Sequence, residues 1–160
     1  RPADICFARG TFNAHPYVVA AMAAFLKRLE RPEVQALYDG LDARWNARCA
    51  QFNARLAAAG APVRMANLST IWTVMYEQPG RYHWMLQFYL RAQGLLLSWV
   101  GSGRLIFSLN HDDAAFEAVC ERFVAAAQAM QADGWWWQAP EQTDRSIRRS
   151  LLRELLRERF

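Results

Sequence analysis

The chain contains 160 residues, of which 53% are hydrophobic, and it carries a formal charge of +4 at pH 7. This length suits one globular domain with a sizeable core, and no apolar run approaches the roughly 20 residues that cross a membrane. The basic residues are mostly interspersed with acidic ones, as on solvated surfaces, so we expect neither a nucleic-acid nor a membrane partner.

The three cysteines, Cys6, Cys49 and Cys120, lie far apart in the chain. An odd and sparse set indicates a reducing compartment rather than a disulfide framework, so a cytoplasmic location is expected. Cys49 and Cys120 fall on apolar helical faces and are expected in the core. No Cys-x-x-Cys motif or group of His and Cys residues indicates a metal site.

Two helices are expected in the first part of the chain. The first runs from about Pro16 to Leu29, because proline is favoured at the first helical position and apolar residues recur at helical spacing. Pro32 ends it and begins a second helix that reaches Ala59, after which Gly60 is expected to form a left-handed cap. The apolar stripe of the second helix comprises Val34, Leu37, Leu41, Trp45, Cys49, Phe52 and Leu56.

The middle of the chain changes to the two-residue period of strands. Residues 68–76 carry β-branched, apolar and aromatic side chains on both faces, which indicates a well-buried strand. A short strand is expected over residues 63–66, and a short aromatic-rich helix over 81–93.

A hairpin and a last domain helix follow. The apolar runs 95–100 and 104–109, separated by Gly101-Ser102-Gly103, predict two antiparallel strands joined by a turn. Asp112 or Asp113 is expected to cap the helix after them. Its apolar stripe comprises Phe116, Val119, Cys120, Phe123, Ala127 and Met130.

The end of the chain forms a separate segment. Asp133-Gly134 breaks the preceding helix, three adjacent tryptophans follow at 135–137, and a further helix begins near Asp144. Three tryptophans cannot all face water cheaply, so we expect them to hold this tail against the domain or against a missing part; an aromatic ligand site is the alternative. The tail helix has a stripe that we expect to pack on the domain or across a dimer: Ile147, Leu151, Leu152, Leu155 and Leu156.

The segment Arg9-Gly10-Thr11-Phe12-Asn13-Ala14-His15-Pro16 has the features of a phosphate-binding loop at the start of a helix. Gly10 allows the backbone to approach an anion closely, and Thr11 offers a hydroxyl and an N–H. The free amides and the positive end of the following helix favour negative charge nearby. A plain loop with Asn13 and His15 as helix-capping groups is the alternative interpretation.

This segment, followed by a small apolar helix, resembles the G-T-[FL]-x-x-[NH]-P stretch of class III pyridoxal-phosphate-dependent aminotransferases, especially their glutamate-1-semialdehyde 2,1-aminomutase branch. Ser108-Leu109-Asn110-His111-Asp112-Asp113 is similar to the region that opens the last helix of that family. The resemblance covers about residues 4–130. It implies an α+β fold in which long helices pack on a small antiparallel sheet, as in the C-terminal small domain of fold-type I enzymes.

The resemblance also implies a domain organisation. Residues 1–15 would be the cofactor-phosphate loop of a large domain missing here, residues 16–132 the C-terminal α+β domain, and residues 133–160 a tryptophan-rich linker with an amphipathic helix. Gly10 and Thr11 match the pair that reaches across a homodimer to bind the phosphate of pyridoxal 5'-phosphate in the partner subunit.

Two further residues bear on chemistry. Arg104 opens an apolar strand after the Gly-Ser-Gly turn and could bind a substrate carboxylate, although the aminomutase pattern has no arginine here and a solvated arginine is the alternative. Lys27 is the only lysine and lies on the polar side of its helix. The family's catalytic lysine lies upstream of the Gly-Thr-Phe segment, so we expect no catalytic residue in this chain, and an inactive isolated chain.

Two functions therefore compete. The first is the C-terminal segment of an aminotransferase or aminomutase that moves an amino group on a small amino-acid or aldehyde substrate. The alternative is a non-catalytic interaction module that docks a partner through the tryptophan run and the C-terminal helix. The Gly-Thr motif favours the enzyme.

Overall fold

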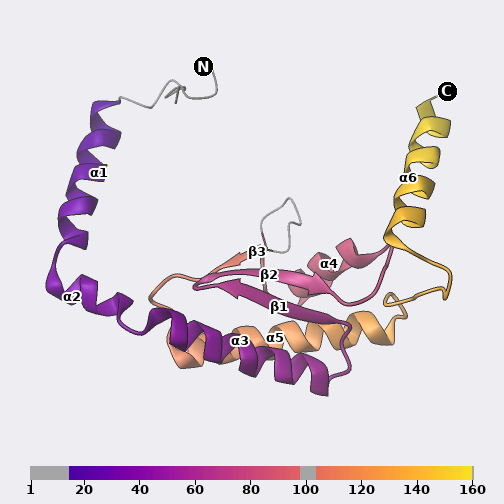
Figure 1. Cartoon of the computed structure of the whole chain (residues 1–160), viewed down its shortest axis with the longest axis horizontal. Coiled ribbons are helices and arrows are strands. Elements are labelled where there is room, and N and C mark those ends of the chain that lie inside the picture. The colour runs from indigo at the N-terminus through magenta and orange to yellow at the C-terminus, as the bar shows by residue number, and fades with distance from the viewer. Residues whose placement is uncertain (1–14, 98–103, 160) are drawn as a thin grey trace. The chain divides into compact units, whose positions relative to one another are not determined.

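The computed structural model describes residues 15–97 and 104–159 (Figure 1). Its contacts divide the chain into two compact units, residues 1–41 and 42–160. Among the described residues, no helix is both long and apolar enough to cross a membrane.

The first unit contains α1 (Pro16–Leu29), the short α2 (Pro32–Gln35) and the 3-10 helix η2 (Ala36–Tyr38). A proline begins both α1 and α2, as expected, because its missing N–H would have no partner there anyway. No residue of α1 is buried, so its apolar stripe lies exposed among the described residues. The exposed side chains include Tyr17, Val18, Val19, Met22, Phe25 and Leu26.

The expectation of a single second helix over residues 32–59 is wrong. The chain leaves the helical path at Asp39-Gly40, and α3 spans Leu41–Ala58. Gly40 has a φ of +63°, a left-handed conformation that cannot continue a right-handed helix. The break separates Leu37, which is exposed, from the part of the stripe that is buried: Trp45, Cys49, Phe52 and Leu56.

A β-hairpin follows α3. Gly60 has the expected left-handed φ of +65°, and β1 (Val63–Leu68) then pairs antiparallel with β2 (Ile71–Tyr76). The sequence placed Leu68 at the start of the second strand. Leu68 instead ends β1, because Ser69 takes a φ of +51° and turns the chain.

β2 is the central strand, yet the buried side chains lie on only one of its faces, which corrects the expectation of a strand buried on both sides. Trp72 and Val74 are buried, whereas Ile71 is 49% exposed and Met75 is 39% exposed. Side chains alternate between the two faces of a strand. The sheet therefore has one core face and one open face.

β3 (Arg104–Ile106) pairs antiparallel with β2 and gives the strand order β1-β2-β3. The expected hairpin places residues 95–100 beside this strand. Leu95–Leu97 form no strand, and residues 98–103, including the Gly-Ser-Gly turn, lie outside the described part. Within the described residues, β3 instead pairs with β2, with Ile71 opposite Ile106.

The expected helix over residues 81–93 forms as two shorter pieces, η3 (His83–Met85) and α4 (Leu86–Ala92). Leu86 and Leu90 of α4 are buried. Gly94, with a φ of +80°, ends this segment as expected.

The core lies between the sheet and two helices, α3 and α5 (Asp113–Ala132), which cover the same face (Figure 1). Asp112 caps α5, because its carboxylate accepts a hydrogen bond from the N–H of Ala115 at 2.7 Å. Trp72 lies edge-on to Trp45, with ring centroids 5.9 Å apart. The largest fully buried side chains are Trp45, Trp72, Phe52, Phe123, Leu56, Met65, Leu86, Leu90, Met130, Val63 and Cys120.

α3 also covers the outer edge of β1. The side-chain amide of Asn53 donates to the carbonyl of Met65 at 2.9 Å, and its own oxygen accepts from the N–H of Met65 at 2.7 Å. The side chain thus occupies the backbone groups that a further strand would need at this residue.

The first two tryptophans of the run hold the tail against the second unit, as expected. The indole N–H of Trp136 donates to the carbonyl of Ala127 at 3.0 Å, and the Trp135 ring packs edge-on against Tyr82 at 5.3 Å. Trp137 is 55% exposed. The tail then forms α6 (Asp144–Arg159).

His83 lies in an aromatic cluster beside the tail. Its ring stacks on that of Tyr76 with centroids 4.0 Å apart, and the ring centroid of Trp136 lies 6.0 Å from that of His83. The Nε2 atom is buried with no hydrogen-bond partner, and a Cβ at Gly80 would lie only 2.2 Å from it. Burial lowers the pKa of His83, and the nearby charge of Asp144 opposes this shift.

Acidification is therefore expected to destabilise the second unit through His83. The unfolded chain binds a proton near pH 6.5, whereas the folded state holds it only at lower pH, so stability present above pH 6.5 is lost as the pH falls through the folded pKa. Urea unfolding at a series of pH values will measure this loss. His83→Phe keeps the stacked ring and removes the titration, so its stability should decline less; parallel curves for the two proteins would contradict the assignment.

Candidate functional site

One row across the open face of the sheet contains two polar side chains, Arg104 and Thr73. Arg104 on β3 lies opposite Thr73 on β2, which in turn lies opposite Ala66 on β1. Leu68, Ile71 and Ile106 form the neighbouring row and are 78%, 49% and 73% exposed. Arg104 is exposed, so its guanidinium is available from this face.

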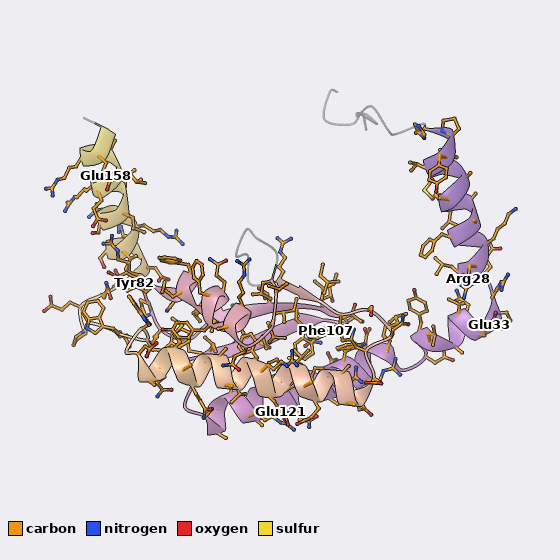
Figure 2. The ribbon with its side chains drawn as sticks, turned by 180° about the vertical axis from the view of Figure 1, so that it is seen from behind. Arg28, Glu33, Tyr82, Phe107, Glu121 and Glu158 are labelled. Atoms are coloured by element: carbon orange, nitrogen blue, oxygen red, sulfur yellow. The ribbon has the colours of Figure 1, made fainter. Side chains whose placement is uncertain are left out.

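A hollow of about 320 Å³ lies beside Arg104. Phe107, labelled in Figure 2, follows β3 directly. It is buried and lines this hollow. Arg104 and His111 are the polar side chains among its lining residues, and the rest of the wall is apolar. Such a combination of an apolar wall with a few polar groups is typical of small-molecule sites. The remaining lining residues are Leu95, Leu96, Leu97, Leu105, Ile106 and Val119.

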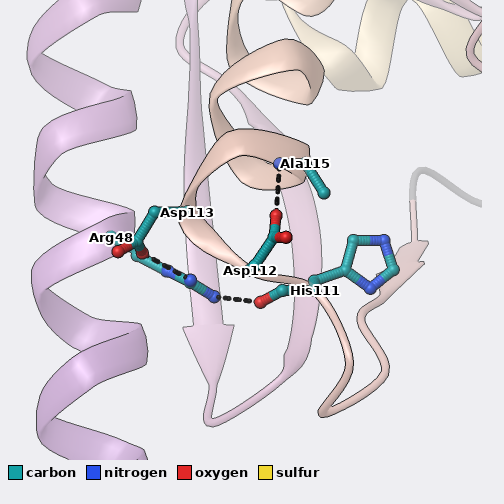
Figure 3. Close-up of polar contacts among 5 residues, drawn as sticks. All are labelled: Arg48, His111, Asp112, Asp113 and Ala115. Carbon is teal, nitrogen blue, oxygen red and sulfur yellow. Dashed lines mark hydrogen bonds and ion pairs between the residues drawn. The ribbon is translucent and has the colours of Figure 1, made fainter.

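The corner between β3 and α5 is held by Arg48 of α3 (Figure 3). Its Nη2 donates to Oδ1 of Asp113 at 2.7 Å, and its Nη1 donates to the carbonyl of His111 at 3.2 Å. The guanidinium also lies 4.6 Å from the ring centre of Trp45 and 5.0 Å from that of Phe116. These contacts fix where His111 enters the wall of the hollow.

The imidazole of His111 has a local partner as well. Its Nδ1 lies 3.0 Å from Oγ of Ser108, and its ring packs edge-on against Phe107. His111 therefore has a structural role at the corner between β3 and α5, besides lining the hollow. Sequence reasoning missed Arg48; the only signal was an arginine next to the apolar stripe of α3.

Other reactive side chains lie in the core or in surface ion pairs. Burial raises the pKa of the Cys49 thiol, and raises that of Cys120 to about 11, so both remain thiols and pack as core residues. Arg55 forms a bidentate ion pair with Glu117 between α3 and α5. Within residues 15–97 and 104–159, no three His, Cys, Asp or Glu side chains gather as a metal site.

The two cofactor contacts predicted from the sequence, Gly10 and Thr11, lie outside the described residues. The lysine of the chain, Lys27, is exposed on α1. A Schiff-base lysine needs a desolvated pocket or a cationic neighbour that lowers its pKa, and Lys27 has no such pocket. The described residues therefore do not make up a complete pyridoxal-phosphate site.

No family model matches this chain. Over 79 residues, or 49% of the chain, it is 34% identical to the glutamate-1-semialdehyde 2,1-aminomutase of Nitratidesulfovibrio vulgaris, and the match covers 18% of that protein. The chain thus spans only a small part of this relative.

Two solved structures share the fold. An omega-transaminase from Sphaerobacter thermophilus matches 79% of this chain and 31% of its own, with a TM-score of 0.61 and 19% identity. A β-phenylalanine aminotransferase from Variovorax paradoxus matches 81% of this chain and 31% of its own, with a TM-score of 0.56 and 25% identity. The small sheet with its helices is thereby confirmed as part of a fold-type I aminotransferase fold. This chain therefore shares its fold with one part of those larger aminotransferases and, over 79 residues, resembles an aminomutase in sequence.

Proposed function

We propose that this chain is the C-terminal segment of a pyridoxal-phosphate-dependent aminotransferase or aminomutase that acts on a small amino-acid or aldehyde substrate. The observation that carries the proposal is the 34% identity to an aminomutase, which agrees with the transaminase fold. The internal amino shift of an aminomutase is the reaction favoured by that relative.

Arg104 is the proposed substrate-binding residue. Its planar guanidinium offers parallel donors that match the two oxygens of a carboxylate. The apolar wall of the neighbouring hollow would shield this ion pair from water and accept the carbon chain of the substrate. The Thr73 hydroxyl, on the strand paired with β3, is the nearest further polar group in the row.

Gly10 and Thr11 are the proposed contacts to the cofactor phosphate. In a homodimer, they would reach the cofactor that the neighbouring subunit holds. Pyridoxal phosphate supplies the electron-withdrawing ring on which amino groups are exchanged. Because Lys27 is exposed and is the only lysine, the Schiff base would have to come from residues outside this chain. We accordingly expect the isolated chain to be inactive, and we propose a cytoplasmic location for the complete enzyme.

Arg104→Ala is expected to raise KM for a carboxylate-bearing substrate by about ten- to a hundredfold, as for the loss of a charge-assisted hydrogen bond. The measurement uses the polypeptide encoded by the complete reading frame, with matched amines that have or lack a carboxylate. The amine without a carboxylate should show an unchanged KM. Arg64→Ala removes an exposed arginine from the opposite edge strand of the same sheet and should leave the KM of both amines unchanged.

Two results would contradict this proposal in different ways. A complete polypeptide with no transaminase or aminomutase activity and no bound cofactor would refute the enzymatic function. Activity with equal effects of Arg104→Ala on both amines would keep the enzyme and remove Arg104 from the substrate site.

A further inference from the structure

The tail helix α6 exposes most of its apolar side. Ile147 is buried, whereas Leu151, Leu152, Leu155 and Leu156 are 38%, 58%, 59% and 51% exposed. Of the two expected placements of this stripe, packing on the domain does not hold for these four leucines within the described chain, and packing across a dimer stays a prediction. Four exposed leucines on two consecutive turns form an apolar surface of the kind that marks interaction sites.

Only one side of α6 faces its own unit. Glu154 forms a bidentate ion pair with Arg81, and Ser150 donates to the same carboxylate at 3.1 Å. The Arg81 guanidinium lowers the pKa of Glu154, so the carboxylate stays charged and paired. Together with Ile147, these residues occupy the side of α6 that turns inward.

A row of arginines lies beside the exposed leucines. Arg145, Arg149 and Arg153 follow one another at four-residue spacing and line a shallow hollow of about 440 Å³ with Thr143, Ser146 and Ser150. Residues four apart lie on one side of a helix. Asp144–Arg159 contains six arginines and three acidic residues, and one of these acids, Glu154, is already neutralised by Arg81.

The charge of this surface selects its partner. If two copies of α6 packed together, their arginine rows would face each other, and the repulsion between like charges disfavours self-association. A lipid surface is disfavoured by Glu158, which lies seven residues after Leu151 and would carry its carboxylate into the apolar phase at that edge. A single helix over Leu152 and Leu156 is narrower and leaves this edge in water. A helix with leucines on one face and carboxylates beside them complements both the leucines and the arginine row.

We propose that α6 is the docking site of an acidic amphipathic helix from a partner protein. The partner's apolar side chains cover Leu152, Leu155 and Leu156, and its carboxylates pair with Arg149 and Arg153. Buried leucine contacts supply the affinity, and the arginine row sets the orientation and the choice of partner. This interaction does not depend on the aminotransferase function, and it lies in the segment beyond the residues that carry the family resemblance.

The test uses the 160-residue chain and a fluorescent model helix of about three heptads, with leucine at the a and d positions and glutamate beside them. A second peptide carries lysine in place of every glutamate. Fluorescence anisotropy should show the glutamate peptide binding at least about tenfold more tightly than the lysine peptide, and this difference should shrink in high salt.

The double variant Arg149→Glu and Arg153→Glu should reverse this preference, weakening the glutamate peptide and strengthening the lysine peptide by about tenfold each. Both side chains are exposed, so the fold should persist by circular dichroism. Arg64→Glu with Arg91→Glu changes the net charge equally at exposed positions outside α6 and should leave the peptide preference unchanged. Leu152→Ser should weaken the glutamate peptide without altering the charge preference.

Three outcomes would overturn the proposal. The first is no measurable binding of the glutamate peptide, or equal binding of both peptides. The second is binding of the chain to phosphatidylglycerol vesicles through Leu152 in the absence of peptide binding. The third is a concentration-dependent dimer that Leu152→Ser disrupts while the glutamate peptide does not compete.

Discussion

Replacing Trp72 by alanine is expected to lower the free energy of unfolding by about 3–5 kcal/mol, the range for truncating a fully buried aromatic side chain. Trp72 is 1% exposed, and its ring centroid lies 5.1 Å from that of Phe107 and 5.7 Å from that of Phe116. Its indole N–H also donates to the carbonyl of Ser69 at 3.0 Å, in the turn of the hairpin. Truncation would leave a cavity where both helices meet the sheet.

Urea unfolding followed by far-UV circular dichroism will measure this effect. Trp84→Ala is the matched control, because Trp84 is 54% exposed and its ring packs edge-on against Phe88 of the adjacent α4. Exposed substitutions usually change stability by less than about 0.5 kcal/mol. Equal losses for the two variants would place Trp72 outside the core. The total free energy of unfolding of a domain of this size is only about 5–15 kcal/mol, so Trp72→Ala could fail to fold. Trp72→Phe offers a milder variant in that case.

Arg48→Ala is expected to cost about 2–4 kcal/mol of unfolding free energy, the second largest effect. The side chain is 8% exposed, and its removal deletes the donor to the His111 carbonyl and the packing of the guanidinium on Trp45 and Phe116. The Asp113 side chain is 98% exposed, so the ion pair itself contributes little.

Asp113→Asn separates these two contributions. It removes the charge of the ion pair and leaves Arg48 in place, so it should cost less than about 1 kcal/mol. Arg91→Ala is the control for an exposed arginine on a helix. If Asp113→Asn destabilises the chain as much as Arg48→Ala, the ion pair rather than the packing of the guanidinium holds the corner.

The sequence was sufficient for the features that depend on neighbouring residues. Pro16 begins α1, Gly60 and Gly94 end helices with positive φ, and Asp112 caps α5. Each of these outcomes follows from the backbone preference or the hydrogen-bonding capacity of one residue and its immediate neighbours. The α+β class follows likewise from the change between helical and strand periods.

The sequence did not show where a helix is interrupted or which face of a strand or helix is buried. The helical stripe runs through Asp39-Gly40 without a change of period, so the interruption before α3 was not visible. The apolar character of Ile71 and Met75 indicated burial, but which face of β2 is covered depends on where α3 and α5 pack. The same limit applies to the leucines of α6, because an amphipathic pattern shows that a helix has an apolar side without naming what covers it.

The candidate site divides in the same way. The sequence by itself determined that Arg104 opens an apolar strand and that Lys27 is the only lysine of the 160 residues. Only the tertiary structure decided that Arg104 pairs across from Thr73 and shares a hollow with His111, and that Arg48, 63 residues before His111, holds that corner. The physical reason is that strand pairing, burial and long-range hydrogen bonds depend on segments distant in the sequence, whereas caps and turns are decided within a few residues.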